Sequence, residues 1–335
     1  MKKLINDPFD FVEESLDGFV LAHEDLIRRV GKRAVARVDA PIEGKVGVVI
    51  GGGSGHLPAF MGYVGPGGAD AAPIGNIFAS PPAKPVLEAT LAANGGAGVI
   101  YSYGNYAGDV MNFDRAAARA GELGIPVRTV LVTDDVASAP PAEADRRRGI
   151  AGDFFVFKVL AAKAETMADL DAVEATTRKA NDATRTVGVG LSACTVPANG
   201  KPTFGLPEDE LELGLGVHGE PGIRRSKIVP VDRLVDDILE IILADKDYRG
   251  QDAAILVNGL GATPYEELYI MYRRARQVLE GLGVRLRQSF VGEYVTSLEM
   301  AGASITLMQL DEELHDLLAA PARCPMFVQM GGRRG

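Results

Sequence analysis

Short apolar runs alternate with longer amphipathic segments along most of the chain. Residues 46–50, 98–103 and 127–132 are apolar runs of strand length, and residues 109–123 carry apolar side chains at helical spacing. In the second half we predict strands over 187–193, 253–257, 286–291 and 305–310, and a helix over 230–244. This alternation predicts an α/β fold with mainly parallel or mixed sheets flanked by helices.

Two helix starts carry recognisable signals. Asp7, Pro8 and Asp10 precede an amphipathic segment near the N-terminus. Residues 263–266 (Thr-Pro-Tyr-Glu) match a capping box and predict a helix running to about residue 282. The length of 335 residues favours two domains. We place the boundary at the end of a polar helix predicted over 168–185, which gives domains 1–185 and 186–335.

Composition narrows the classes of function. The formal net charge of −10 disfavours a nucleic-acid partner, and no apolar run is long enough to cross a bilayer. The two cysteines, Cys194 and Cys324, lack the spacing of a disulfide framework or a metal site. We therefore expect a cytoplasmic protein without a metal, a membrane segment or a nucleic-acid partner.

Two of the four histidines lie in glycine-framed loops, at His56 within residues 51–56 and at His218 within residues 214–222. Glycine lets the backbone turn sharply and approach a ligand, so these loops are expected to expose both imidazoles to a small molecule. Residues 51–56 follow a predicted strand, but they lack the Gly-Lys-Ser/Thr ending of a phosphate loop and the third glycine of a dinucleotide loop. For His56 a purely structural turn, and for His218 a solvated loop position, are the alternatives.

Several acidic and polar residues have competing interpretations. Asp109 opens a helix, where an aspartate caps free N–H groups, yet the same carboxylate can accept a proton. Asp134 and Asp135 resemble metal ligands, although a solvated turn is the simpler interpretation. We expect His23 and His315 at the surface, and Cys194 as a buried small apolar residue.

Five motifs in order resemble those of the dihydroxyacetone kinase family, and specifically its substrate-binding K subunit. They are residues 51–56, 105–113, 193–197, 216–222 and 258–264. The resemblance covers nearly the whole chain, from residue 1 to residue 310. It implies a two-domain α/β structure that forms a homodimer.

The resemblance also implies roles for particular residues. His218 would bond through a ring nitrogen to the ketone carbon of the substrate and form a hemiaminal, which selects carbonyl compounds over polyols. His56 would act as general base at the terminal hydroxyl, with Asp109 as its helper. The substrate-binding residues implied are Gly53, Ser54, Gly55, His56, Phe78, Ser80, Asp109 and His218.

Partners follow from the same resemblance. In this family ATP, or a rephosphorylated ADP, and magnesium are held by a separate L-type partner subunit, so no cofactor is expected on this chain. The phosphoryl donor is then ATP itself or phosphoenolpyruvate acting through a phosphotransferase-system phosphocarrier.

The chain departs from the family pattern at two positions. Gly104 stands where the family usually has lysine, and Leu57 where it usually has glutamate. We expect the loss of the lysine to open volume and to make a tetrulose such as erythrulose a competitor of dihydroxyacetone.

Two other functions compete with a kinase subunit. The first is a ketose-sensing coactivator or regulator of the same fold, which would need only the trap at His218. The second, an isomerase or aldolase working through the two histidines, is weaker because no lysine or metal-ligand set supports an enolate.

Overall fold

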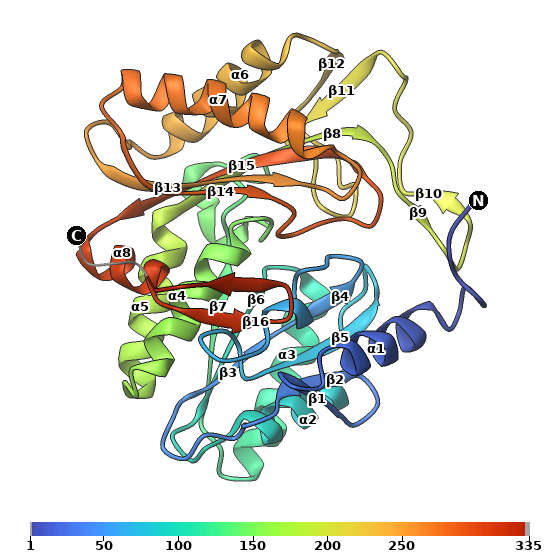
Figure 1. Cartoon of the computed structure of the whole chain (residues 1–335), viewed down its shortest axis with the longest axis vertical. Coiled ribbons are helices and arrows are strands. Elements are labelled where there is room, and N and C mark those ends of the chain that lie inside the picture. Colours follow the sequence, from blue (N-terminus) through green and yellow to red (C-terminus); the bar gives the residue numbers. More distant parts are fainter. Residues whose placement is uncertain (1, 332–335) are drawn as a thin grey trace.

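Two sheets and three layers of helices build the protein (Figure 1). The computed structural model describes residues 2–331. In Figure 1 the first half of the chain forms the lower sheet with its helices, and the second half forms the upper sheet. The predicted α/β class with mixed sheets is confirmed.

The first sheet has the strand order β1-β2-β5-β3-β6-β7, and β4 pairs with β5. Its strands are β1 (Ile27–Val30), β2 (Ala34–Arg37), β3 (Gly47–Ile50), β4 (Gly52–Ser54), β5 (Ala71–Ile77), β6 (Val99–Gly104) and β7 (Val127–Val132). Neighbours from β5 to β7 run parallel, whereas β1 and β2 add an antiparallel edge. Loops after β3 and β6 therefore leave the sheet at the same edge, where open α/β sheets bind ligands.

The second sheet has the order β12-β11-β8-β15-β13-β14 and is antiparallel except for the pair β13 and β14. Its strands are β8 (Thr184–Ser192), β11 (Glu210–Leu213), β12 (Arg224–Lys227), β13 (Asp252–Gly259), β14 (Arg285–Gly292) and β15 (Ala301–Leu310). Two small hairpins stand apart from it. They are β9 (Thr195–Val196) with β10 (Lys201–Pro202), and β16 (Ala322–Cys324) with β17 (Phe327–Gln329).

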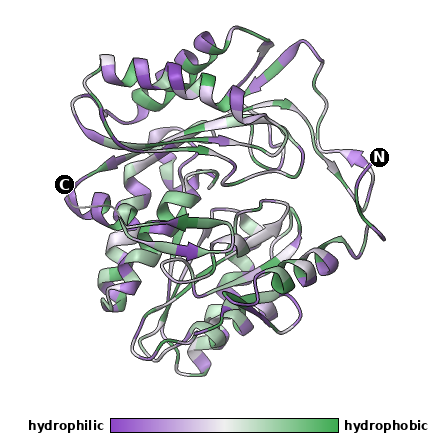
Figure 2. Cartoon of the chain, in the orientation of Figure 1, coloured by the Kyte–Doolittle hydropathy of each residue, from purple (hydrophilic) through white to green (hydrophobic). Residues whose placement is uncertain are grey.

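Helices cover both faces of each sheet. Their bounds are α1 (Phe11–Ala22), α2 (Ala83–Ala93), α3 (Ala107–Glu122), α4 (Asp153–Glu165), α5 (Leu170–Ala183), α6 (Val231–Asp245), α7 (Tyr265–Gly281) and α8 (Glu312–Ala319), with short 3-10 helices at Met61–Tyr63 and Pro141–Arg146. Helices α2 and α3 share a core with the outer face of the first sheet, and α6 and α7 with the outer face of the second. The outer pair α6 and α7 shows both hydrophilic and hydrophobic colour in Figure 2, as amphipathic helices do.

Helix α4 lies between the two sheets and is apolar on nearly all sides. Its residues from Asp153 to Ala162 are all buried, including three phenylalanines. They share one core with strands of the first sheet and with Leu256 and Met308 of the second. Because this core draws on both halves of the chain, the division into domains at residue 185 stays a prediction.

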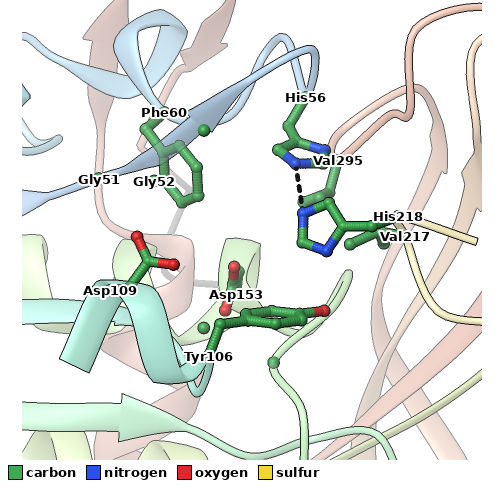
Figure 3. A pocket seen from close by; sticks show the side chains of 13 residues that line it. Gly51, Gly52, His56, Phe60, Tyr106, Asp109, Asp153, Val217, His218 and Val295 are labelled. Atoms are coloured by element: carbon green, nitrogen blue, oxygen red, sulfur yellow. Dashed lines mark hydrogen bonds between the residues drawn. The ribbon is translucent and has the colours of Figure 1, made fainter. Parts of the chain in front are cut away.

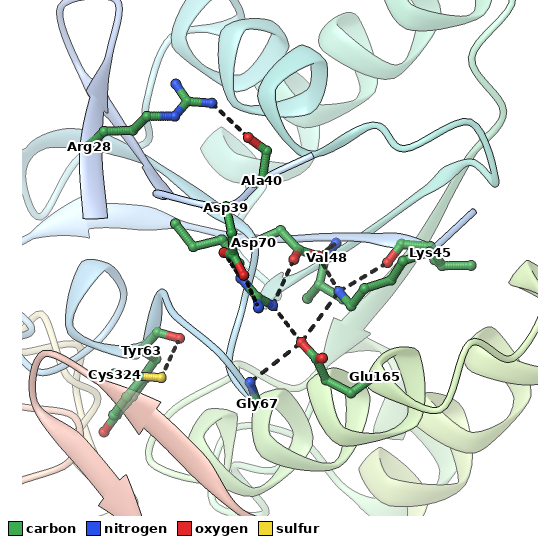
Figure 4. Close-up of polar contacts among 12 residues, drawn as sticks. Arg28, Asp39, Ala40, Lys45, Val48, Tyr63, Gly67, Asp70, Glu165 and Cys324 are labelled. Carbon is green, nitrogen blue, oxygen red and sulfur yellow. Dashed lines mark hydrogen bonds and ion pairs between the residues drawn. The ribbon is translucent and has the colours of Figure 1, made fainter. Parts of the chain in front are cut away.

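A buried ion cluster ties the first sheet to the C-terminal end of α4 (Figure 4). The Lys45 ammonium lies 2.6 Å from the Asp70 carboxylate, and Arg37 pairs with both Asp70 and Glu165. Arg37, Lys45 and Asp70 are each at most 3% exposed. Removing one partner of such a cluster leaves an uncompensated buried charge, which costs far more than the intact cluster contributes.

One predicted local feature is wrong. Helix α7 begins near the expected residue, but Thr263 does not cap it. The Thr263 hydroxyl donates to the Gly302 carbonyl at 2.7 Å and accepts from the Gly302 N–H at 2.9 Å. The side chain therefore joins the helix start to β15 instead of closing a capping box. Within residues 2–331 no helix combines the length and apolar character needed to cross a membrane.

Candidate active site

The two glycine-framed loops meet at one pocket, although 162 positions separate their histidines (Figure 3). One loop follows β3, and the other connects β11 to β12. The lining residues are Gly51, Gly52, Gly53, His56, Phe60, Gly104, Tyr106, Asp109, Gly149, Asp153, Val217, His218 and Val295. The free volume is about 30 Å³, far below the roughly 300 Å³ at which pockets for drug-sized ligands begin.

His56 is buried, which corrects the expectation of an exposed imidazole. Only 3% of the residue is accessible, because the segment with Thr296 and Leu298 covers the glycine loop and donates backbone hydrogen bonds to the His56 and Gly55 carbonyls. Its Nδ1 lies 2.6 Å from the Thr296 carbonyl, so Nδ1 carries a proton and donates it there. Burial, followed by the nearby charge of His218, lowers the pKa of His56 to about 3. The His56 ring is therefore neutral at pH 7, and its Nε2 is free to accept a hydrogen bond.

The imidazole of His218 is held by Glu220. The Nδ1 atom lies 2.8 Å from Glu220 Oε1, and the backbone N–H of His218 donates to Oε2 at 3.0 Å. Burial acts to raise the pKa of Glu220, but the hydrogen bond and charge of His218 prevail and lower it to about 2. A Cβ at Gly216 would lie 2.1 Å from Glu220 Oε2, so a larger residue there would displace this carboxylate.

The two imidazoles face each other through their Nε2 atoms, which lie 3.1 Å apart. Since each Nδ1 is already a donor to an oxygen, two neutral rings would place two lone pairs in contact. One shared proton between the Nε2 atoms resolves this conflict, and the Glu220 carboxylate balances its charge. The pair can therefore present a nucleophilic nitrogen and a proton at one point in the pocket.

Asp109 lies on the opposite side of the pocket, in the first turn of α3. It does not act as a helix cap: the N-cap residue is Tyr106, which makes no side-chain cap bond. Within residues 2–331 the Asp109 Oδ1 atom has no hydrogen-bond partner. Burial raises the pKa of Asp109 to about 6, a value suited to a base that works near neutral pH.

The structure divides the predicted substrate-binding residues into two groups. Gly53, His56, Asp109 and His218 line the pocket, whereas Ser54, Gly55, Phe78 and Ser80 are not among its lining residues. The Ser54 hydroxyl donates to the Gly75 carbonyl at 2.8 Å and so holds the glycine loop to β5. Phe78 packs behind both imidazoles, with ring centroids 5.1 Å from His56 and 5.4 Å from His218.

Asp134 and Asp135 form neither a metal site nor a solvated turn. Both are fully buried, and within residues 2–331 no acidic, histidine or cysteine cluster suited to a metal is present. Asp134 accepts the N–H groups of Ile150 and Gly152 at 2.8 and 2.7 Å. Asp135 pairs with Arg148 at 2.8 Å. The partners of both aspartates lie more than ten residues further along the chain. The local sequence therefore did not indicate that the two carboxylates are buried.

Gly104 and Leu57, the two positions expected to depart from the family pattern, lie in different places. Gly104 lines the pocket, but little space opens there, because a Cβ would already lie 3.1 Å from the Gly149 carbonyl and from the Tyr106 ring. Leu57 lines a separate cavity of about 310 Å³ on the other side of the glycine loop. Of these two positions, only Gly104 changes the pocket wall itself.

Tyr106 and Asp153 also line the pocket, although neither stands out in the sequence as a site residue. Tyr106 lies within the motif at residues 105–113, and its ring packs edge-on against His218. Asp153 follows a glycine-rich turn and carried no comparable signal. His23 and His315 are partly exposed, and Cys194 is buried as expected.

Fold and site together define an α/β protein whose small pocket combines two facing imidazoles with buried carboxylates. The Dak1 domain family model matches residues 17–326. The chain belongs to the Dak1 domain family, and the resemblance to dihydroxyacetone kinases is confirmed.

Two relatives illustrate the range of related proteins. The chain is 46% identical over 330 residues to PTS-dependent dihydroxyacetone kinase 2, dihydroxyacetone-binding subunit DhaK, of Listeria innocua, covering 98% of this chain and 99% of that protein. It is 45% identical over 332 residues to L-erythrulose kinase of Pectobacterium atrosepticum, covering 98% of this chain but 56% of that protein. The chain thus spans just over half of the second relative.

Two solved structures support the same family assignment. The dihydroxyacetone kinase from C. freundii in complex with AMP-PNP and Mg²⁺ matches with a TM-score of 0.89 at 31% identity, over 99% of this chain and 62% of that chain. The dihydroxyacetone kinase operon co-activator DhaQ matches with a TM-score of 0.88 at 31% identity, over 95% of this chain and 98% of that chain.

Proposed function

We propose that this protein is the substrate-binding subunit of a split short-chain ketose kinase. It binds dihydroxyacetone or a related ketose while a nucleotide-bearing L-type partner phosphorylates a terminal hydroxyl. The observation that carries the proposal is the His218 ring, whose Nδ1 is fixed by Glu220 so that Nε2 points into the pocket beside His56. The family membership and the names of the relatives agree with it.

The imidazole pair supplies what hemiaminal formation requires. The lone pair of His218 Nε2 attacks the ketone carbon, and the carbonyl π electrons move onto oxygen. The proton shared by the two Nε2 atoms passes through His56 to that oxygen, which leaves a neutral carbinol bonded to nitrogen. A polyol offers no electrophilic carbon, so the same site discriminates against glycerol by bond formation.

The second step activates the terminal hydroxyl. We assign the base to Asp109 and not to His56, because burial leaves His56 with a pKa of about 3 and Asp109 with one of about 6. An ionised Asp109 takes the hydroxyl proton as the oxygen attacks the phosphoryl group. His56 remains the hydrogen-bond partner of the captured oxygen.

The phosphoryl donor is expected on the partner, where ATP and magnesium supply the transferable group and neutralise its charge. The names of two relatives, PTS-dependent and PEP-dependent dihydroxyacetone kinase subunits, support a phosphocarrier as donor. The related C. freundii kinase, solved with AMP-PNP and Mg²⁺, makes an ATP-using partner the alternative. A homodimer and a cytoplasmic location belong to the same proposal.

The similarity to the co-activator DhaQ favours one second candidate, a ketose-sensing regulator without turnover.

The test is a phosphorylation assay with the purified chain and an L-type partner. The donor is either ATP with Mg²⁺ or a reconstituted phosphotransferase system. The mixture should convert dihydroxyacetone or erythrulose to its phosphate. Within that assay, His218→Ala is expected to raise KM and to weaken discrimination against glycerol, whereas Asp109→Asn lowers kcat. Tight ketose binding with no phosphate formed under either donor would favour the regulator.

A further inference from the structure

A second buried carboxyl group faces the pocket and has no place in the chemistry above. Asp153 is the first residue of α4, is 3% exposed, and lines the pocket. Its Oδ1 atom has no hydrogen-bond partner within the part of the chain that the structure describes. Buried polar atoms in folded proteins are nearly always paired, so an orphaned carboxyl oxygen at a pocket wall points to a ligand group that pairs with it.

The wall around Asp153 is built from backbone. A Cβ at Gly149 would lie 2.4 Å from the Gly104 Cα and 3.1 Å from Asp153 Oδ1. These distances place the carboxyl group next to Gly104, which adds no side chain to this wall. The polar side-chain atoms available to a ligand here are therefore those of Asp153, and a carboxylate oxygen accepts hydrogen bonds.

The surroundings of Asp153 favour the protonated form of its carboxyl group. Burial raises its pKa well above the ordinary value, and the charges of Asp134 and Asp109 act in the same direction. Asp134 already accepts the N–H groups of Ile150 and Gly152 near the start of α4, so it takes up part of the stabilisation that this helix terminus offers an anion. A protonated carboxyl group both donates and accepts, which matches the hydrogen-bonding capacity of an alcohol.

Figure 3 shows Asp109 and Asp153 on one side of the pocket and the two imidazoles on the other. A triose ketone bonded at its carbonyl carbon to His218, with one hydroxyl at Asp109, has one hydroxyl left. A four-carbon ketose has two. We propose that Asp153 binds the additional hydroxyl of a four-carbon ketose and is thereby a specificity-determining residue of this pocket. This inference rests on the proposed function and names the substrate class within it.

The test compares equilibrium binding of dihydroxyacetone, D-erythrulose and L-erythrulose to the full chain by calorimetry, without a partner subunit. The wild-type protein should bind one erythrulose at least about tenfold more tightly than dihydroxyacetone, since a site that pairs with a hydroxyl rejects an analogue lacking it. Asp153→Ala should reduce the ratio of the dihydroxyacetone Kd to the erythrulose Kd at least about tenfold. Asp153→Asn, which retains a donor and an acceptor, should restore most of it.

Tyr103→Phe is the matched control. Tyr103 lies beside Gly104 in sequence, is fully buried, and also has an unpaired oxygen within residues 2–331, but it does not line the pocket. Both Asp153→Ala and Tyr103→Phe remove an unpaired buried group and should raise Tm by about a few degrees, yet only the first should alter the ketose ratio.

Equal loss of affinity for all three ketoses in Asp153→Ala would overturn the specificity role, as would an unchanged ratio or a wild-type preference for dihydroxyacetone. Failure of the proposed function looks different: the wild-type chain would then bind none of the ketoses, or His218→Ala would bind them as tightly as wild type.

Discussion

Replacing Asp109 by asparagine should stabilise the protein at neutral pH while impairing its chemistry. Burial raises the pKa of Asp109 from about 3.9 for a free side chain to about 6. A difference of about two units corresponds to roughly 3 kcal/mol, by which the folded state disfavours the ionised carboxylate. The amide of asparagine is neutral but also buried, so we expect a net gain of about 1 to 3 kcal/mol in the free energy of unfolding at pH 7.

The sign of the pH dependence follows from the direction of this shift. Because the folded pKa lies above the unfolded one, the folded protein binds a proton that the unfolded chain lacks between about pH 4 and pH 6. The destabilisation by Asp109 is therefore fully present above pH 6 and disappears below about pH 4. The gain in unfolding free energy of Asp109→Asn over wild type should therefore be absent below about pH 4 and fully present above about pH 6.

Urea unfolding of wild type and Asp109→Asn at pH 7.5 and pH 4 measures this difference. Asp114→Asn on the same helix is the matched control, because Asp114 is exposed and its replacement should change stability by no more than about 0.5 kcal/mol. If Asp109→Asn were less stable than wild type at pH 7.5, or if its advantage were the same at both pH values, the buried-base account of Asp109 would be refuted.

Three further outcomes are expected. The pH profile of kcat/KM for ketose phosphorylation should fall on the acid side with a midpoint near pH 6, the pKa of Asp109, and a midpoint near 3 would instead implicate His56. Glu220→Gln should lower the unfolding free energy at pH 7 by about 2 kcal/mol, because the substitution removes the stabilised carboxylate. The difference from wild type should shrink as the pH falls from about 4.3 toward 2, and urea unfolding at pH 7 and near pH 2 checks it. Lys45→Met leaves Asp70 buried without its nearest cation and should cost about 3 kcal/mol or more in the same assay, and a loss under 1 kcal/mol would contradict the role given to the cluster.

The parts of the fold that the sequence predicted are those with a local signal. Strand β7 and helices α1, α6 and α7 have clear periodicity or turn residues at their ends, and the structure places them within a few residues of the expected bounds. Helix α4 has no amphipathic signal in the sequence, because it is buried between two sheets and lacks the polar face that makes a helix recognisable.

In the candidate site, too, only the features with a local signal could be predicted from the sequence. The glycine-framed loops identified His56 and His218, since a histidine among glycines is unusual whatever surrounds it. The burial of His56, the pairing of Asp135 with Arg148 and the orphaned oxygen of Asp153 arise from contacts between distant segments. No local pattern encodes such contacts, so these environments required the structure.

The central claim is that His218 captures the ketone carbon through Nε2. Carbon NMR of the ¹⁵N-histidine-labelled chain mixed with dihydroxyacetone labelled with ¹³C at its carbonyl carbon tests it most directly. The bound carbon should become tetrahedral and show one-bond coupling to a histidine nitrogen in wild type, and this signal should be absent in His218→Ala. A bound ketone carbon that stays trigonal in wild type, or a nitrogen coupling that persists in His218→Ala, would contradict the account.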